Sequence, residues 1–398
     1  MHDIEFEHII EKRHLEDFCQ RNADAKIIGF DTEFVSENRY RPQLCLLQIA
    51  TPDSLAIVDT IAINDISPFW QLICEQVETT VVHAAREEFL FCLREYGKRP
   101  RGLVDLQLAA AFVGHEFPAA YSSLAQKILN KRLGKGETRT DWRMRPLSKK
   151  QIHYALQDVE FLIPMHTELI GELKRLGRMD WYWQEIDAWQ ANLERTEREP
   201  QWQRLPGLTR LSRRDLAVVR ELFLWRDAAA KTKERAPRRV LPDDLLIEIA
   251  KRGESQTNKL TAIRGLTQRV NARSLPDIGA VVARARALPE SQWPAKVNSA
   301  PSPSVGILGQ ILTASLNLLC HEKNIAPGLV ATAQEIKNLA AWKMGVSDEP
   351  SEPEILSGWR GPFVNELFDD VLKGRVVLRV TDPNSANPVR LEKWPEQD

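Results

Sequence analysis

Acidic side chains stand in three places along the chain, with spacings that would let them act together on a metal ion. Asp31 and Glu33 follow an apolar run, and residues two apart on a strand point to the same face, so their carboxylates can converge. Two adjacent carboxylates repel unless a cation lies between them, and oxygen ligands suit Mg²⁺ or Mn²⁺. A solvated strand end with ordinary surface acids would carry the same pair, so the pair alone decides nothing.

The other two places lie further along the chain. His83-Ala84-Ala85-Arg86-Glu87-Glu88 runs from an expected strand into an expected helix. Tyr154 and Asp158 are four apart in an expected helix and therefore share one face. An exposed Asp beside a core Tyr would have the same spacing. The order of the three places, with an acid pair on a strand followed by acids on two later helices, favours a single metal site.

The elements that must position these residues follow from the hydrophobic pattern of residues 1–170. Short β-like runs predict strands, and 3.6-residue periods predict helices. Strands are expected at residues 25–30, 44–50, 55–59 and 79–83, and helices at 65–77, 86–96 and, as the longest periodic stretch, 148–176. Three adjacent strands followed by a helix, a strand and a helix predict an α/β domain with a mixed sheet and helices on its faces.

The remainder of the chain is helical in pattern and interrupted by proline-rich stretches. We expect a first domain over residues 1–195, a first helical domain over 205–290, a second over 303–380 and a loose tail over 381–398. Charged, proline-containing stretches at 194–206 and 289–304 are expected to be linkers. The fold class is therefore α/β plus all-α, with two small helical bundles after the mixed-sheet domain.

Composition places the protein among ordinary globular chains of more than one domain. The 398 residues are 43% hydrophobic and 27% charged, with a net charge of −1. The N-terminus is acidic, unlike a signal peptide, and no apolar run is expected to span a bilayer. The five cysteines form no CxxC pair. We therefore expect a reducing, cytoplasmic location, no membrane contact and a monomer.

Several motifs, in the same order along the chain, resemble ribonuclease D, a family of 3′–5′ exonucleases with four metal-binding acids and an active-site tyrosine. They are Gly29-Phe30-Asp31-Thr32-Glu33-Phe34, His83-Ala84-Ala85, Asp105-Leu106-Gln107, Asp141-Trp142-Arg143-Met144-Arg145-Pro146-Leu147-Ser148 and Tyr154-Ala155-Leu156-Gln157-Asp158. The resemblance covers nearly the whole chain. It implies an RNase H-like sheet domain and two HRDC-like helical domains, HRDC being the small helical domain shared by helicases and ribonuclease D.

The resemblance also implies the roles of the site residues. Asp31 would bridge two divalent ions, Mg²⁺ or Mn²⁺, and Glu33 and Asp158 would complete the site of the ion that activates water. Tyr154 would orient that water, and the second ion would stabilise the leaving 3′ oxygen. In-line attack would release a nucleoside 5′-monophosphate. The catalytic set is then Asp31, Glu33, Glu88, Tyr154 and Asp158, and its four acids are the metal ligands.

Two positions need a choice between neighbouring residues. The family has Asp five residues after the His of the second motif, where this chain has Glu88. The longer Glu could hold a metal directly or through water, or displace it; Glu87 would point about 100° away on a helix, so Glu88 is the predicted ligand. His153, five residues before Asp158, has the spacing of a sister class that uses His as general base, but the surrounding residues resemble the tyrosine class.

Two stretches of the chain are locally basic. Lys127–Lys150 holds nine Lys or Arg against two acids, and Arg204–Arg239 holds eleven against four. Such stretches could bind phosphates without regard to sequence, although solvated charged surfaces have the same composition. The residues expected to contact nucleic acid are Arg139, Arg143, Arg213, Arg214, Arg226 and Lys231.

The leading hypothesis is a metal-dependent 3′–5′ exoribonuclease acting on structured RNA with a short 3′ tail, such as a tRNA precursor. The choice of RNA over DNA as the substrate rests on the resemblance, since two-metal hydrolysis can cleave either. The alternatives are therefore a DNA 3′–5′ exonuclease, and an RNA-binding protein whose metal site is weakened by Glu88.

Overall fold

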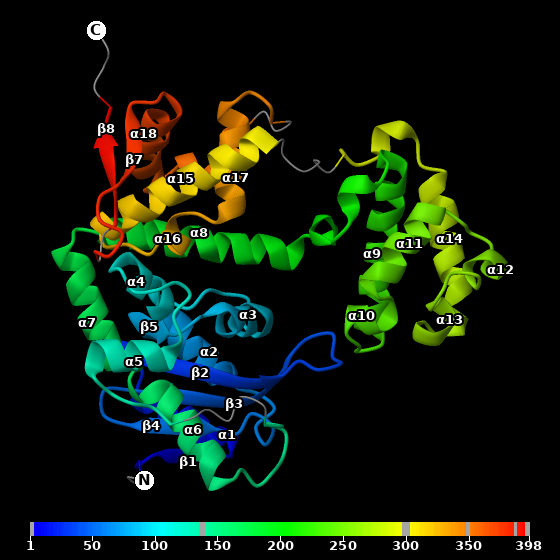
Figure 1. Ribbon diagram of the computed structural model, residues 1–398. Coiled ribbons are helices and arrows are strands. Elements are labelled where there is room, and N and C mark those ends of the chain that lie inside the picture. The colour runs from blue at the N-terminus through cyan, green and yellow to red at the C-terminus, as the bar shows by residue number, and fades with distance from the viewer. Residues whose placement is uncertain (1–3, 135–139, 297–302, 348–350, 386–387, 395–398) are drawn as a thin grey trace. The chain divides into compact units, whose positions relative to one another are not determined.

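The computed structural model describes residues 4–134, 140–296, 303–347, 351–385 and 388–394, and the chain forms two compact units (Figure 1). Unit 1 comprises Met1–Glu33, Leu44–Leu193 and Pro301–Asp398. Unit 2 comprises Phe34–Gln43 and Glu194–Ala300. The third expected domain therefore belongs to the same unit as the first, and a short segment between two strands of the first domain belongs to unit 2.

One six-stranded sheet organises the N-terminal domain, in the order β1-β4-β3-β2-β5-β6. Its strands are β1 (Glu7–Ile9), β2 (Ile27–Val35), β3 (Gln43–Ala50), β4 (Leu55–Val58), β5 (Thr79–Val82) and β6 (Leu103–Asp105). β1 is parallel to β4, β5 is parallel to β2 and to β6, and β3 and β4 are antiparallel. The mixed sheet expected from the sequence is confirmed, and its two outer strands, β1 and β6, are short.

The central strand β2 is longer than its hydrophobic pattern indicated. It was expected to end at Phe30, but it continues to Val35, so Asp31 and Glu33 lie within the strand. Acids have low intrinsic preference for strands, and pairing with neighbouring strands overrides that preference here. The two carboxyl groups therefore sit on a fixed, hydrogen-bonded backbone and not on a solvated strand end.

Helices surround this sheet (Figure 1). They are α1 (Lys12–Arg21), α2 (Ser67–Gln71) with a π turn over Leu72–Gln76, α3 (Arg86–Glu95), α4 (Leu106–Phe112), α5 (Tyr121–Leu129), α6 (Lys149–Glu160), α7 (Leu162–Arg175) and α8 (Met179–Arg198). The long helix expected over 148–176 is broken at Phe161, whose backbone N donates to the Tyr121 hydroxyl at 3.1 Å. The expected linker 194–206 begins as helix, because α8 continues to Arg198.

The last part of the chain packs into the hydrophobic core of the sheet domain. Its elements are α15 (Pro303–Glu322), α16 (Pro327–Val330), α17 (Ala333–Lys343), α18 (Arg360–Leu372), β7 (Val376–Val380) and β8 (Val389–Lys393). Phe112 of α4 and Leu316 of α15 belong to one core cluster. Arg178 donates to the carbonyl of Phe112 at 2.5 Å and to that of Asn324 at 2.7 Å.

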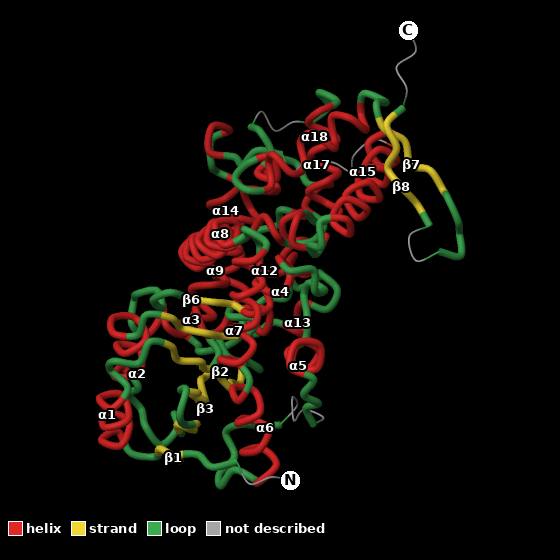
Figure 2. The backbone as a smooth tube through the Cα atoms, turned by 90° about the vertical axis from the view of Figure 1, so that its left-hand side faces the viewer, coloured by secondary structure: helices red, strands yellow, loops and turns green. Residues whose placement is uncertain are grey.

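Two expectations about this region are wrong. Residues 381–398 were expected to be loose, but β8 lies within them and pairs antiparallel with β7, Val380 opposite Val389 (Figure 2). No apolar run was expected to be long enough for a membrane, yet among the described residues α15 has that length and composition. Its buried side chains, such as Val305 and Leu312, belong to the shared core, and 33% of its most apolar stretch is buried.

Unit 2 has a separate hydrophobic core that its own helices enclose. They are α9 (Arg213–Thr232), α10 (Pro237–Val240), α11 (Asp243–Arg252), α12 (Thr257–Leu260), α13 (Leu266–Arg269) and α14 (Leu275–Arg286). The Ser212 side chain caps the N-terminus of α9 by accepting a hydrogen bond from the backbone N of Asp215, and this bond fixes the residue at which the helix begins. This is the helical bundle expected over 205–290.

Candidate active site

The central strand places two of the predicted acids on one face. Asp31 and Glu33 are two residues apart on β2 and point the same way, and Thr32 points to the other side. Gly29 shares the face of the two acids, and a Cβ at Gly29 would lie 3.0 Å from the Cβ of Leu162, the first residue of α7. The backbone of β2 therefore approaches the junction between α6 and α7 closely.

The second predicted motif forms the turn that starts α3. Ala84 has a φ of 56°, and the Asp105 carboxylate accepts from the backbone N of Ala84 and of Ala85, each at 3.0 Å. Asp105 thus fixes the turn from which α3 begins. Glu88, in the first turn of α3, is only 5% exposed, and its Oε1 accepts from the Thr32 hydroxyl at 2.6 Å. This hydrogen bond joins α3 to β2.

Of the two neighbouring glutamates, only Glu88 is tied to the central strand in this way. Glu87 is partly exposed and pairs with Arg86, its Oε1 lying 3.4 Å from the Arg86 Nε. The structure thus separates the two residues as the helical spacing predicted. The role of Glu88 as a ligand stays a prediction.

The third motif lies on α6, whose N-terminus is fixed by a capping box between Ser148 and Gln151. The Tyr154 hydroxyl donates to the Asp158 carboxylate, and this bond partly offsets the effect of burial on the pKa of Asp158. His153 instead lies near Glu160, because its charge partly offsets the rise that burial causes in the pKa of that carboxyl. Tyr154, in contrast, is influenced by Asp158, Glu33 and Asp31. The water-orienting role of Tyr154 stays a prediction.

The pKa values of the four predicted acids are all raised, and those of Asp31 and Glu33 respond to the charges of the other acids. Burial raises the pKa of Asp31 well above its usual range, and the charges of Glu88, Asp158 and Glu33 raise it further. Burial, then Asp158 and Glu88, raise the pKa of Glu33 to about 8. Burial also raises the pKa of Glu88 and of Asp158 to about 7 each. Each of these carboxyls is therefore more costly to ionise here than in water.

Such a group of partly buried carboxyl oxygens with raised pKa values fits hard divalent cations. All four candidate ligands are carboxylates, the type that Mg²⁺ and Mn²⁺ prefer, and a cation would relieve the repulsion. Among the described residues, however, no three His, Cys, Asp or Glu side chains already stand in coordinating geometry. Glu88 is held by Thr32 at 2.6 Å, so it would have to exchange this hydrogen bond to bind an ion directly.

The residues predicted to contact nucleic acid do not form one class in the structure. Arg226 is wrong: it is 4% exposed, pairs with Asp243 at 2.5 Å and donates to the Leu241 carbonyl at 3.0 Å. Its place on the inner face of α9 could not be distinguished from the exposed face by charge alone. Lys231, on the same helix, is exposed as expected.

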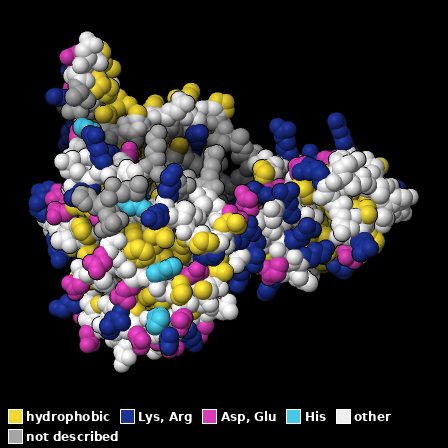
Figure 3. Space-filling model, turned by 90° about the horizontal axis from the view of Figure 1, so that it is seen from below, with side chains coloured by type: hydrophobic (Ala, Val, Ile, Leu, Met, Phe, Trp, Pro, Cys, Tyr) yellow, Lys and Arg dark blue, Asp and Glu magenta, His cyan; other side chains and the backbone are white. Residues whose placement is uncertain are grey.

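The other predicted arginines that the structure describes form hydrogen bonds or ion pairs with protein groups. Arg213 donates to the Pro294 carbonyl at 3.2 Å, and Arg214 to the Arg286 carbonyl at 3.0 Å. Arg143 pairs with Asp141 at 2.8 Å, and Arg139 lies outside the described residues. Figure 3 shows Lys and Arg side chains interspersed with acids over unit 2, at the right of the view. The surface there is mixed in charge and not uniformly basic.

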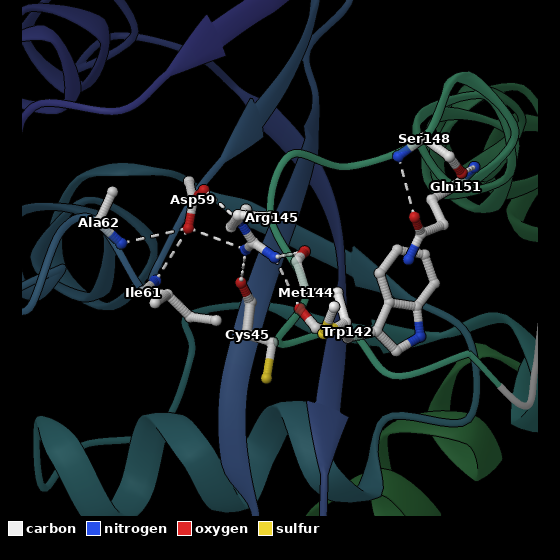
Figure 4. A network of polar contacts seen from close by, with 9 residues as sticks. All are labelled: Cys45, Asp59, Ile61, Ala62, Trp142, Met144, Arg145, Ser148 and Gln151. Carbon is white, nitrogen blue, oxygen red and sulfur yellow. Dashed lines mark hydrogen bonds and ion pairs between the residues drawn. The ribbon is translucent and has the colours of Figure 1, made fainter.

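Sequence reasoning missed a partly buried ion pair between Arg145 and Asp59. Arg145 lies in the basic stretch 127–150, but it binds Asp59, which follows β4, with Nη2 to Oδ1 at 2.8 Å (Figure 4). Asp59 is 5% exposed. An Arg in a charged loop gives no signal of a distant acidic partner, and Asp59 was read only as the end of a strand.

Comparison with known proteins covers nearly the whole chain. Residues 6–174 match the family model described as 3′–5′ exonuclease, and residues 215–282 match the HRDC domain. Ribonuclease D of Gluconacetobacter diazotrophicus is 33% identical over 89% of this chain and 89% of that protein. Ribonuclease D of Escherichia coli strain K12 is 28% identical over 90% of this chain and 96% of that protein.

The fold agrees with a solved structure as well. The crystal structure of Escherichia coli RNase D, described as an exoribonuclease involved in structured RNA processing, superposes with a TM-score of 0.81. It covers 93% of this chain and 99% of that one, at 27% identity. The likeness extends through the sheet domain and both helical bundles.

Proposed function

This chain belongs to the ribonuclease D family, and we propose that it removes nucleotides one at a time from the 3′ end of structured RNA, such as a tRNA precursor. It is an exoribonuclease with a 3′–5′ exonuclease domain. The observation that carries the proposal is the group of Asp31, Glu33, Asp158 and Glu88, of which Glu88 is buried and the others are partly buried, and in which the charges of the other acids raise the pKa of Asp31. Such a group is suited to two divalent cations at a phosphodiester.

In this proposal the chain's own residues bind and orient the reactants. Asp31, facing the other acids from the rigid strand β2, would contact both ions, and Glu33 and Asp158 would complete one of the two sites. Glu88, now held by Thr32, would serve the other site. Bound divalent ions supply charge stabilisation for the attacking and leaving oxygens.

Tyr154 would act as an orienting hydrogen-bond donor and not as a base. Burial, followed by the charges of Asp158 and Glu33, raises the pKa of Tyr154 far above its usual range, so the hydroxyl keeps its proton at neutral pH. A protonated hydroxyl can hold the attacking water in line with the scissile phosphorus. Tyr154→Phe should therefore lower kcat more than His153→Ala does, and the reverse order would assign the role to His153.

A time course of nucleotide release from a tRNA precursor, with Mg²⁺ or Mn²⁺ and with chelator, tests the function. We expect 5′-monophosphates from the 3′ end, no release with chelator, and none from Asp31→Ala, which retains the fold. Asp24→Ala is the matched control, because Asp24 is an exposed acid outside the site. RNA binding without nucleotide release by the wild-type protein would contradict an enzyme and favour a binding protein.

The choice of RNA over DNA needs its own comparison. RNA and DNA substrates of the same sequence, each with the same duplex and 3′ overhang, should be hydrolysed at different rates, with RNA faster. Faster hydrolysis of DNA would make the chain a DNA exonuclease that shares the family fold. The same assays, with gel filtration of the purified protein, would test the expected monomer.

A further inference from the structure

The segment before α6 is fastened to the sheet through a single arginine side chain (Figure 4). The Arg145 guanidinium binds Asp59 with two nitrogens, Nε to Oδ2 at 2.5 Å and Nη2 to Oδ1 at 2.8 Å. Nη2 also donates to the carbonyl of Cys45 on β3 at 2.9 Å. Asp59 itself is fixed, since its Oδ1 accepts from the backbone N of Ile61 at 3.1 Å and its own backbone N binds the Ile9 carbonyl at 2.9 Å.

The same guanidinium also holds the segment's own backbone. Its Nη1 donates to the carbonyl of Trp142 at 2.7 Å and to that of Met144 at 2.9 Å. With the bonds to Asp59 and Cys45, all five N–H groups of the guanidinium have partners. Arg145 therefore has no N–H left for an RNA phosphate, although it lies in the basic stretch 127–150. Lysine, with a single point charge and three donors, could not reproduce this geometry.

The segment that Arg145 holds contacts the candidate active site through the rings of Trp142 and Tyr154. Trp142, whose carbonyl Arg145 holds, is 3% exposed, and its ring centroid lies 6.1 Å from that of Tyr154, at an interplanar angle of 32°. The Tyr154 hydroxyl in turn binds Asp158. A continuous path of contacts thus leads from Asp59 through Arg145 and Trp142 to Tyr154.

We propose that Arg145 is a positioning residue: its guanidinium fixes Trp142 against Tyr154 and so keeps the tyrosine hydroxyl directed at the acid cluster. The inference rests on the proposed role of Tyr154. A misplacement of about 1 Å at a reacting group can reduce turnover by about 100-fold, so a loosened segment would act on kcat. RNA affinity would change little, because all five N–H groups of Arg145 are bound within the chain and its replacement removes no direct phosphate contact.

The test measures kcat and KM for release of the terminal nucleotide from a single-stranded RNA. For Arg145→Lys we expect kcat to fall by about 10- to 100-fold with KM within about twofold of wild type. Arg175→Lys is the matched control, because Arg175 also makes two bonds to one carboxylate, that of Glu172, on the exposed side of α7. It should leave both constants unchanged. A rise in KM with kcat unchanged would make Arg145 a phosphate ligand and overturn the inference.

A double-mutant cycle separates positioning of Tyr154 from a general loss of fold. If Arg145 acts through Tyr154, Arg145→Lys should cost less than about threefold in kcat when Tyr154→Phe is already present. An equal, independent loss in both backgrounds would overturn the inference. Should Arg145→Lys fail to fold, Trp142→Phe replaces it in the same cycle, with the same expectations. An inactive wild-type protein would refute the proposed function as well, whereas an active Arg145→Lys refutes only the positioning role.

Discussion

Divalent cations and protons should compete for the acid cluster, and the competition should be visible between pH 6 and pH 8. In the metal-free protein burial and the neighbouring acids raise the pKa of Glu33 to about 8, whereas in the unfolded chain its value is near 4.5. The folded protein therefore binds more protons in this range than the unfolded one. Its stability must fall as pH rises, and bound Mg²⁺ should restore it.

The size of the effect follows from that single pKa. Raising the pH from 6 to 8 takes Glu33 from almost fully protonated to half ionised in the folded state, which costs about 2 kcal/mol of unfolding free energy. The same titration should weaken Mg²⁺ binding about 50-fold at pH 6 relative to pH 8, because the proton must leave before the ion binds. Glu88 and Asp158, with pKa values of about 7 each, act in the same direction.

Urea unfolding of the chelated protein at pH 6, 7 and 8, with and without Mg²⁺, measures this effect. Glu33→Gln should flatten the pH dependence, and Glu16→Gln, at an exposed acid, should not. The comparison removes the contribution of buried histidines such as His166, whose pKa is lowered by burial and whose effect on stability has the opposite sign. Equal slopes for wild type and Glu33→Gln would refute the electrostatic description of the cluster.

Three further outcomes follow from the ion pairs and charges described above. Arg226→Ala should reduce stability by about 1–3 kcal/mol in urea unfolding, because Asp243 would lose a buried partner but keep Arg238, whose Nε lies 2.8 Å from its Oδ2. A change within about 0.5 kcal/mol would mean that the pair contributes nothing. Lys231→Ala should instead weaken RNA binding and reduce its salt dependence with stability unchanged, and unchanged binding would remove Lys231 from the interface. Burial raises the pKa of Asp59, but the hydrogen bonds from Arg145, Ala62 and Ile61 and the Arg145 charge together outweigh burial and lower the pKa overall. The ionised Asp59 should therefore add stability above about pH 4 that is lost as pH falls further, and an Asp59→Asn variant with the same loss of stability in acid would contradict this.

Local spacing was enough to predict which site residues share a face of one element. Asp31 and Glu33 are on one strand face, and Tyr154 and Asp158 are on one helix face, because the periods of strand and helix are fixed by the backbone. The same reasoning failed where a property depends on a distant partner. Arg226 was read as a surface charge because a sequence does not reveal that Asp243 lies opposite it.

The predicted ends of helices and strands were also wrong in places, again because they depend on contacts with distant segments. The helix expected over 148–176 breaks where the Phe161 backbone meets the Tyr121 hydroxyl, a contact between segments 40 residues apart. Strand β2 continues past its apolar residues because its neighbours in the sheet continue to pair with it. Periodicity describes one segment by itself, and both outcomes were decided by a second segment.

The shared core of the sheet domain and the C-terminal bundle has a consequence for synthesis on the ribosome. Phe112 and Tyr182 emerge early, but partners such as Trp359 and Phe368 are translated only after the whole of residues 194–300. At typical translation speeds that interval lasts roughly 5–20 s. During that interval the apolar surface that Trp359 and Phe368 will cover stays exposed on the nascent nuclease domain.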